Sequence, residues 1–175
     1  VLCLSWMGPP PTGIYTLSLH DALAVDVCAR RGQGNKSWTP EANPDCRRVF
    51  ADIDWSKTPL GSQEGWCVEL RTLVSVMLGS LQPMLIVWGP SQITLYNDGY
   101  AAMCGNRHPG AFARPFHDLW YDIWDQVDPI ITNAYNGIGT AMDDIEFLMH
   151  RKGYPEETHF AFSYTPVRDP WGAVL

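Results

Sequence analysis

The residue types that could carry out covalent catalysis lie together in one stretch of the chain. Cys104 is followed by His108 and then by Asp118. A thiol nucleophile needs a nearby base and a group that orients this base, so the three residues could form a Cys/His hydrolase site. No activating motif surrounds them, and capping or surface roles explain the histidine and aspartate more simply. We expect Cys104 to be a small buried hydrophobic side chain.

Two further groups of polar residues could bind metal or transfer protons. His150 and His159 flank a predicted turn at 151–157, where they could face each other across a hairpin. Such a pair is more often solvated than bound to metal. Glu156 and Glu157 are adjacent on the same turn, a position at which carboxylates are usually exposed. The pattern therefore indicates no metal site.

The cysteines do not form a metal or disulfide framework. They are Cys3, Cys28, Cys46, Cys67 and Cys104, an odd number without any CxxC pair. This spacing argues against both a zinc site and a set of disulfides. Free thiols suit a reducing cytoplasm, and we expect a cytoplasmic protein.

Composition and charge restrict the classes of partner. The 175 residues are 46% hydrophobic and 12% aromatic, with a net charge of −7. This is the composition of a globular core, and an acidic chain without a basic cluster lacks the charge pattern that binds nucleic acid or anionic membranes. The most apolar window, 73–89, is interrupted by polar residues and Pro83. It therefore reads as a helix followed by a strand, and we expect no membrane contact.

The first part of the chain, residues 1–51, reads as an unstructured or artefactual leader. The string "GPPPTGIYTLSLHDAL" at 8–23 resembles translated sequencing-adapter sequence, and 30–45 is rich in Gly, Pro, Asn and Ser. An ordinary flexible leader would have the same composition. We expect order to begin near Asp52.

A flanking segment at 52–82 is predicted to contain a helix that begins near Ser62, a possible N-cap. Its apolar residues recur at steps of three and four: Trp66, Leu70, Leu73, Val74, Met77, Leu78 and Leu81. Such a stripe usually faces a core. The alternative is that 63–81 pairs with a second copy of the chain to form a homodimer.

The domain at 83–175 begins with a predicted hairpin. The apolar runs 84–88 and 93–96 are of strand length, and the Gly-Pro-Ser-Gln sequence between them favours a turn. Asn97 or Asp98 is then expected to cap a short helix at 99–104, which makes both residues structural caps.

Helices and then strands follow. Pro115 divides 111–120 into two predicted short helices, and 121–137 has one apolar helical face with a possible kink at Pro129. From Ala141 the apolar period is two, and 158–167 alternates in the same way. This order predicts an α+β fold, with helices gathered over one face of an antiparallel sheet.

Several sequence segments resemble a PAS domain, specifically the N-terminal PAS module of bacterial PAS/GAF/HWE-type sensor histidine kinases. They are "DWSKTPLG", "EGW", "LRTLVSVML", "PMLIVWGP", "LYNDGY", "HPGAFARP", "LWYDIWDQV", "RKGYPEETHFAFSYTPVRD" and "WG", in collinear order over residues 52–175. The resemblance implies a sheet of five strands whose last strand lies between 84–88 and 158–167. Only 172–175 would belong to that strand, so we expect a domain truncated at its C-terminal end.

The function implied by the resemblance is signal transduction in a two-component phosphorelay. Such a module senses a small ligand, redox state or partner and signals to a kinase that lies C-terminal to it. The chain contains no kinase motif: Gly137 and Gly139 lack the GxGxxG spacing, so we expect no enzyme activity. Cys104 lacks the flavin-adduct motif of LOV domains, and 121–138 contains no histidine for haem. No cofactor is indicated.

The candidate ligand pocket is a set of aromatic residues on the predicted elements. They are Trp88, Tyr96, Tyr100, Phe112, Phe116, Trp120, Trp124, Phe147, Phe160, Phe162 and Tyr164. They could fill the core completely or surround a small cavity with polar tyrosine and tryptophan tips. Strand phase decides which of them point inward. A sensor, a dimerisation module without ligand and a small Cys/His hydrolase remain the three alternatives.

Overall fold

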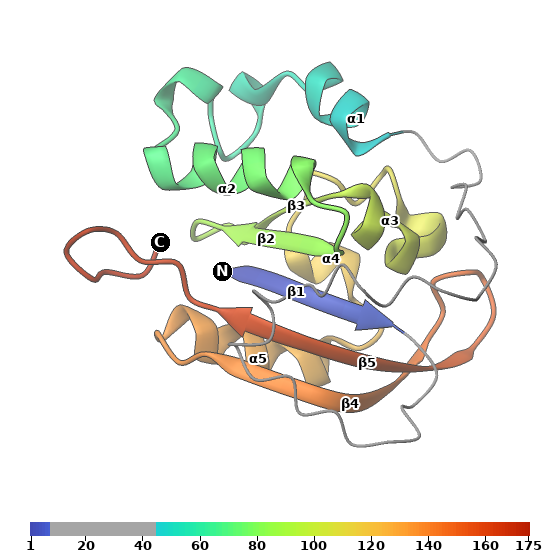
Figure 1. The fold of residues 1–175 in the computed structure, drawn as a ribbon. Helices are drawn as coiled ribbons and strands as arrows, with labels where there is room; N and C mark the ends of the chain where they lie inside the picture. Colours follow the sequence, from blue (N-terminus) through green and yellow to red (C-terminus); the bar gives the residue numbers. More distant parts are fainter. Residues whose placement is uncertain (8–44) are drawn as a thin grey trace, which may run out of the picture.

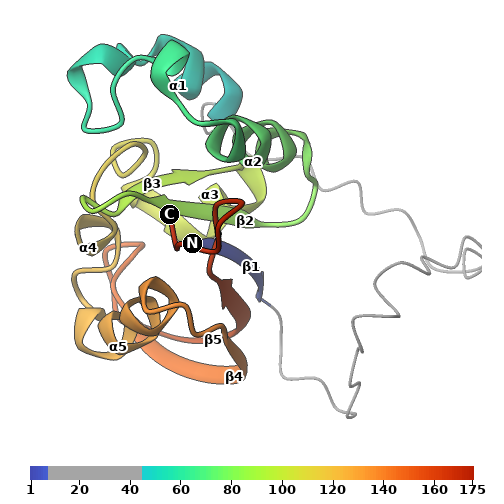
Figure 2. The same cartoon turned by 90° about the vertical axis from the view of Figure 1, so that its left-hand side faces the viewer.

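A five-stranded antiparallel sheet curls around three helices in the computed structural model, which describes residues 1–7 and 45–175 (Figures 1 and 2). The strands are β1 (Leu2–Met7), β2 (Met84–Trp88), β3 (Ile93–Tyr96), β4 (Thr140–Met149) and β5 (Glu156–Thr165). They lie in the order β3-β2-β1-β5-β4. The predicted α+β, PAS-like fold class is confirmed.

Helices cover both faces of one half of the sheet. They are α1 (Cys46–Asp52), α2 (Val68–Gly79), α3 (Asp98–Cys104), α4 (Phe116–Leu119) and α5 (Trp124–Tyr135), with short 3-10 turns at Trp55–Lys57, Gln63–Gly65 and Gly105–Arg107. Helices α3, α4 and α5 lie on the concave face, and α2 packs against the other face of β2 and β3 (Figures 1 and 2). Every residue of β2 and β3 is therefore buried.

Among residues 1–7 and 45–175, helices cover the other half of the sheet on one face only. In β4 and β5 the burial alternates, with Phe147, Met149, Phe160 and Tyr164 facing the helices. This difference explains the two sequence patterns. A strand covered on both faces reads as a continuous apolar run such as "MLIVW", whereas a half-covered strand alternates.

Strand β1 contradicts the expectation that residues 1–51 are an unstructured leader. Residues Leu2–Met7 pair antiparallel with β5, and the first three of them also pair with β2, so that Cys3 lies opposite Tyr164 on one side and Leu85 on the other. Residues Cys46–Asp52 form α1. The pairing satisfies the backbone N–H and C=O groups of β2 and β5, which would otherwise be unpaired in the middle of the sheet. The adapter-like string at 8–23 lies outside the described residues.

The strand expected at 172–175 is also wrong. The chain reverses after β5, where Asp169 N–H donates to Ala173 O, and Val174 makes only an isolated bridge to Arg168. The place predicted for that strand, between β2 and the strand near 158–167, is taken by β1.

Several predicted boundaries shift. Helix α2 begins at Val68 with Cys67 as its N-cap, while Ser62 precedes only the short 3-10 turn. Leu81 is 98% exposed, because the helix ends at Gly79 and the apolar stripe does not continue past it.

The region around the prolines and the last strand also differs from prediction. One short helix, α4, replaces the two helices expected at 111–120, because Pro115 stands at its N-cap and the preceding residues form turns. Pro129 lies inside α5, and β5 spans Glu156–Thr165 rather than 158–167.

The side chain of Asn97 joins four elements. Its Oδ1 accepts hydrogen bonds from the N–H groups of Tyr100 (3.1 Å) and Met84 (3.0 Å), which caps α3 and fixes the start of β2. Its Nδ2 donates to three carbonyl oxygens at the end of α2 and in the following turn, those of Met77, Ser80 and Gln82, at 2.7–3.2 Å. The prediction of Asn97 as a cap is confirmed.

Asp98 acts as a cap for a different helix. Its Oδ1 accepts from the N–H of Cys46 at 2.7 Å, at the start of α1. The carboxylate therefore holds α1 against α3, across 52 positions of sequence.

We predict that Asn97→Ala lowers the free energy of unfolding by about 3 kcal/mol, because several buried backbone groups lose their partner at once. Asp98→Ala is the control and should cost only about 1 kcal/mol, as the loss of one cap. Urea denaturation measures both. Equal losses at the two positions would contradict the central role of Asn97.

Candidate functional site

A small cavity lies between the concave face of the sheet and helices α3 and α5. It is lined by Tyr100, Met103, Trp120, Ile123, Val127, Phe147, Met149, Phe160, Phe162 and Tyr164, and its volume is about 30 Å³. Strand phase explains the lining: Phe160, Phe162 and Tyr164 are two residues apart on β5, so all three point toward the helices. In β4, Phe147 and Met149 follow the same rule.

Six of the eleven predicted pocket residues line this cavity: Tyr100, Trp120, Phe147, Phe160, Phe162 and Tyr164. The other five are Trp88, Tyr96, Phe112, Phe116 and Trp124, and they pack elsewhere in the structure. Tyr96 contacts Phe112, with ring centroids 5.0 Å apart, and Phe116 contacts both Trp124 and Tyr164. Trp88 is buried at the end of β2. The pocket lining thus comes mainly from α3, the α4–α5 turn and the β4–β5 pair.

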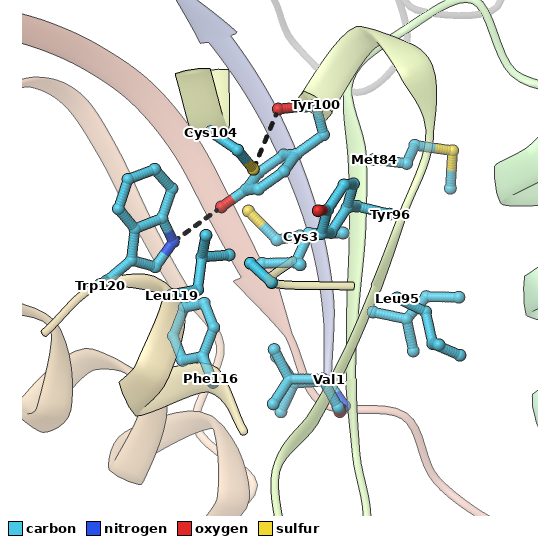
Figure 3. Packing of buried hydrophobic residues seen from close by; sticks show 14 of the residues in the cluster. Val1, Cys3, Met84, Leu95, Tyr96, Tyr100, Cys104, Phe116, Leu119 and Trp120 are labelled. Carbon is cyan, nitrogen blue, oxygen red and sulfur yellow. Dashed lines mark hydrogen bonds between the residues drawn. The ribbon is translucent and has the colours of Figure 1, made fainter. Parts of the chain in front are cut away.

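Polar atoms reach the cavity from three aromatic side chains. The indole N–H of Trp120 donates to the hydroxyl of Tyr100 at 3.1 Å (Figure 3). The hydroxyl of Tyr164 makes no hydrogen bond to any other residue in the described part of the chain. Burial raises the pKa of both tyrosines well above the ordinary value, so both remain neutral phenols.

The size of the cavity limits what it holds in this conformation. One water molecule needs about 10–15 Å³, so the space takes about two waters, whereas pockets for organic ligands usually exceed about 300 Å³. Met103 and Met149 are the adaptable parts of the wall, since methionine has several rotatable bonds and no branch. A ligand with a ring would enter only if at least one of these two side chains moves aside.

The three residues of the hydrolase hypothesis lie in different surroundings. Cys104 is fully buried and its thiol donates to Tyr100 O at 3.5 Å (Figure 3). Burial raises its pKa far above the ordinary value, which opposes thiolate formation. His108 is buried, with Nδ1 3.0 Å from the Tyr96 hydroxyl, while Asp118 is half exposed beside His117. Cys104 therefore matches the expected role of a small buried hydrophobic side chain.

Two buried ion pairs support one end of the cavity, and the sequence did not reveal them. The Arg107 guanidinium donates to Leu119 O and to Asp122 Oδ2, each at 2.6 Å, and stacks on the rings of Trp120 and Tyr121. Burial alone would raise the pKa of Asp122, but the hydrogen bonds from Arg107 and from the His150 N–H hold it below the ordinary value. This pairing fixes Trp120 at the cavity wall.

The second pair lies on the β4–β5 turn. Arg151 is buried and donates through Nε to Glu156 Oε1 and through Nη1 to Met103 O, both at 2.8 Å. Glu156 is therefore an ion-pair partner rather than an exposed turn residue, whereas Glu157 is exposed. The sequence "RKGYPE" reads only as a turn, because nothing in it signals that the arginine folds inward.

His159 does not face His150. It lies opposite Glu146 on the uncovered face of β4 and β5, with Nδ1 2.9 Å from Asp144 Oδ1 and Nε2 3.3 Å from Glu157 Oε1. Glu146, Glu157 and His159 offer potential metal-ligand atoms within 4.8 Å of one another. The hydrogen bonds to Asp144 and Glu157 raise the pKa of His159 above its ordinary value, so the protonated imidazole can serve as the cation of this cluster.

Comparison of the chain with family models, with curated proteins and with solved structures finds no match. The class of fold is therefore defined by the structure itself: α+β, with an open antiparallel sheet of five strands and helices on its faces. Within residues 1–7 and 45–175, no helix has the length and apolar character needed to cross a membrane.

We predict opposite outcomes for two hydroxyl deletions in the cavity. Tyr100→Phe should lower the free energy of unfolding by about 1–2 kcal/mol, because the buried Trp120 N–H loses its acceptor. Tyr164→Phe should change it by less than about 0.5 kcal/mol, because no described residue hydrogen-bonds to this hydroxyl. Thermal or urea unfolding of both variants measures the contrast. A larger loss for Tyr164→Phe would place an unrecognised partner at its hydroxyl.

The raised pKa of His159 predicts that the stability of the protein depends on pH. Its pKa is raised in the folded state, so its contribution is complete below pH 6.5, the ordinary value, and is lost as pH rises through the folded pKa. Urea midpoints from about pH 6 to about pH 9 should fall more for the unchanged chain than for His159→Gln. Parallel pH profiles for the two proteins would show that the cluster does not hold a proton.

Proposed function

We propose that the chain is a PAS-type sensory module of a bacterial, cytoplasmic two-component histidine kinase, and that it binds a small organic ligand in the cavity between sheet and helices. The proposal rests on the resemblance of residues 52–175 and on the α+β fold class. The module itself carries no catalysis, and it passes the signal to a kinase outside this chain.

The observation that carries the proposal is the position of the cavity. It lies between the sheet and the helices, with aromatic walls, an indole N–H and two tyrosine hydroxyls. Apolar walls with a few convergent polar groups are typical of small-molecule sites. The Tyr164 hydroxyl, which hydrogen-bonds to none of the described residues, is the group best suited to select a ligand with one polar atom, since it can both donate and accept.

Because large side chains line the cavity and leave little space, the ligand must be small. A single ring requires displacement of Met103 or Met149, so the ligand-bound state differs from this one by a methionine rearrangement. Ligand binding would then move a methionine on α3 or β4, so the domain would have one conformation without ligand and another with it. A sensor needs two such conformations whose populations the ligand shifts.

Binding of indole and of benzene, measured by ligand-observed NMR, tests the proposal. Both probes should bind the unchanged chain in a saturable way, and Met149→Ala should bind them at least about tenfold more tightly because it enlarges the cavity. Native mass spectrometry of the purified protein adds a search for a small molecule that copurifies.

Met77→Ala is the matched control. Met77 is as deeply buried as Met149, but it lies on α2 and does not line the cavity. It should destabilise the protein without changing the affinity for either probe. Absence of saturable binding to both the unchanged chain and Met149→Ala would refute a ligand site in this cavity.

A dimerisation module is the second candidate, because α2 exposes two valines, whereas the predicted apolar stripe is buried at Leu70, Val74 and Met77. Val68 is 61% exposed and Val76 is 53% exposed. Each is four residues from Thr72, so the three side chains lie along one side of the helix. A shallow groove at Val68 is also lined by Glu69, Thr72, Leu73 and Val167. A second copy of the helix would cover these side chains. The pairing would differ from the alternative stated for 63–81, because the core buries the stripe on which that alternative relied.

Sedimentation equilibrium distinguishes this candidate from the first. If α2 dimerises the protein, Val76→Glu should convert a dimer to a monomer, whereas Arg71→Glu, also on α2 but not one of the two exposed valines, should not. A monomer for the unchanged chain at all concentrations would exclude the dimer through α2.

A further inference from the structure

We propose that Glu146, Glu157 and His159 bind a divalent transition-metal ion, for which Zn²⁺ is the best fit, and that Asp144 orients the histidine. The site lies on the outer face of β4 and β5, which is turned away from the cavity and α5. The three side chains offer ligand atoms within 4.8 Å of one another. The proposal does not depend on the sensory function, because the cavity residues of β4 and β5 lie on the opposite face of the same strands.

Strand pairing fixes the histidine beside both glutamates. Glu146 of β4 lies directly opposite His159 of β5, and Glu157 lies two residues before His159 on the same strand. Opposite residues and residues two apart share one face of a sheet, with opposite Cβ atoms about 4.5–5.5 Å apart. The inward neighbours Phe147 and Phe160 are buried and hold the two strands on the core. The three potential ligands therefore project from a fixed backbone.

A β-bulge places Asp144 on the same outer face. Between the pairs Met142–Phe162 and Ile145–Phe160, β4 has one residue more than β5. Both Met142 and Ile145 pack against the core, whereas strict alternation from Met142 would turn the residue at 144 inward. The extra residue reverses the alternation and turns Asp144 outward, beside the histidine ring. Such bulges often re-aim a side chain next to a functional site.

The two ring nitrogens of His159 have different neighbours. Nδ1 lies 2.9 Å from Asp144 Oδ1, whereas Nε2 lies 3.3 Å from Glu157 Oε1. A metal-bound histidine generally donates its other ring N–H to a carboxylate or carbonyl, which fixes the tautomer and the orientation of the ring. Asp144 has the position of that carboxylate. The nitrogen available to a metal ion is therefore Nε2, and the ion would replace the proton that Nε2 carries in the imidazolium.

The donor set favours Zn²⁺ over Mg²⁺ and Ca²⁺. Zn²⁺ accepts imidazole and carboxylate together, whereas Mg²⁺ and Ca²⁺ take oxygen ligands. Ligand atoms on a tetrahedral Zn²⁺ are about 3.4 Å apart, so the exposed glutamate side chains need only rotate inward. A water molecule completes the coordination. With Asp144, three carboxylates lie around one imidazole, and this excess of negative charge attracts a cation.

Isothermal titration calorimetry of the full chain with ZnCl₂ tests the site. Cys28 and Cys67 are changed to serine in every protein, because thiolates also bind Zn²⁺. This parent should bind one ion in a saturable way. His159→Gln and Glu146→Gln should each weaken binding by more than about tenfold, since each removes a ligand, and Asp144→Asn should weaken it about tenfold, as the loss of an orienting partner.

His117→Gln is the matched control. His117 also lies beside a carboxylate, with Nδ1 3.7 Å from Asp118 Oδ1, but it is on α4 and outside the cluster. This variant should bind Zn²⁺ as tightly as the parent. All the changed side chains of the cluster are at least partly exposed, and urea denaturation verifies that each variant is folded before titration.

Mg²⁺ distinguishes this site from an acidic surface that attracts any cation. In about 1 mM MgCl₂ the Zn²⁺ affinity of the parent should stay within about twofold, because the imidazole ligand discriminates against Mg²⁺. Loss of most Zn²⁺ binding in MgCl₂ would overturn the proposal. So would the absence of saturable binding to the parent, or equal affinities of the parent and His159→Gln. Equal affinities of the parent and Asp144→Asn would overturn the orienting role of Asp144.

Discussion

The amide of Asn97 is the interaction on which the arrangement of the first half of the domain depends. One side chain satisfies backbone groups at the end of α2, in the turn that follows, at the start of β2 and in the first turn of α3. These segments meet at a place where the chain changes direction twice and where the Asn97 side chain is buried. Because buried backbone groups without partners are costly, an asparagine that provides both donors and acceptors allows α2 and α3 to lie on opposite faces of the same hairpin.

The parts of the fold that sequence predicted well are those in which local pattern and tertiary environment agree. The runs at 84–88 and 93–96 were identified as strands, and the Asn-Asp pair as capping residues, because turn chemistry and apolar periodicity point the same way. Strand β1 was missed for the opposite reason. Residues 1–7 are too short to show periodicity, and the Gly- and Pro-rich composition after them suggested that the whole segment was a leader. Pairing across 86 positions of sequence, as between Val1 N–H and Val87 O, leaves no local signal.

The site shows the same division between what pattern reveals and what it does not. The alternation of Phe160, Phe162 and Tyr164 placed these three of the ten lining residues on one face of a strand, although it did not show that this face points inward. Arg107 and Arg151 were not predicted, because an arginine in a turn is normally exposed and only the completed fold provides the carboxylates and carbonyls that surround it. Five aromatic residues were placed in the pocket although they pack elsewhere, since composition cannot distinguish a residue that fills the core from one that borders a cavity.

The unequal covering of the sheet has a consequence for how such a sequence can diverge. In β2 and β3 every side chain is buried, whichever face of the sheet it lies on. Substitutions that keep the protein folded must therefore preserve side-chain volume and apolar character. In β4 and β5 every second residue points to solvent, as Asp144, Glu146, Glu157 and His159 do. Random mutagenesis followed by selection for folded protein would leave β2 and β3 nearly unchanged, while the outer positions of β4 and β5 would vary freely. New surface charges on β4 and β5 can therefore arise, and new binding partners with them, while the hydrophobic core stays intact.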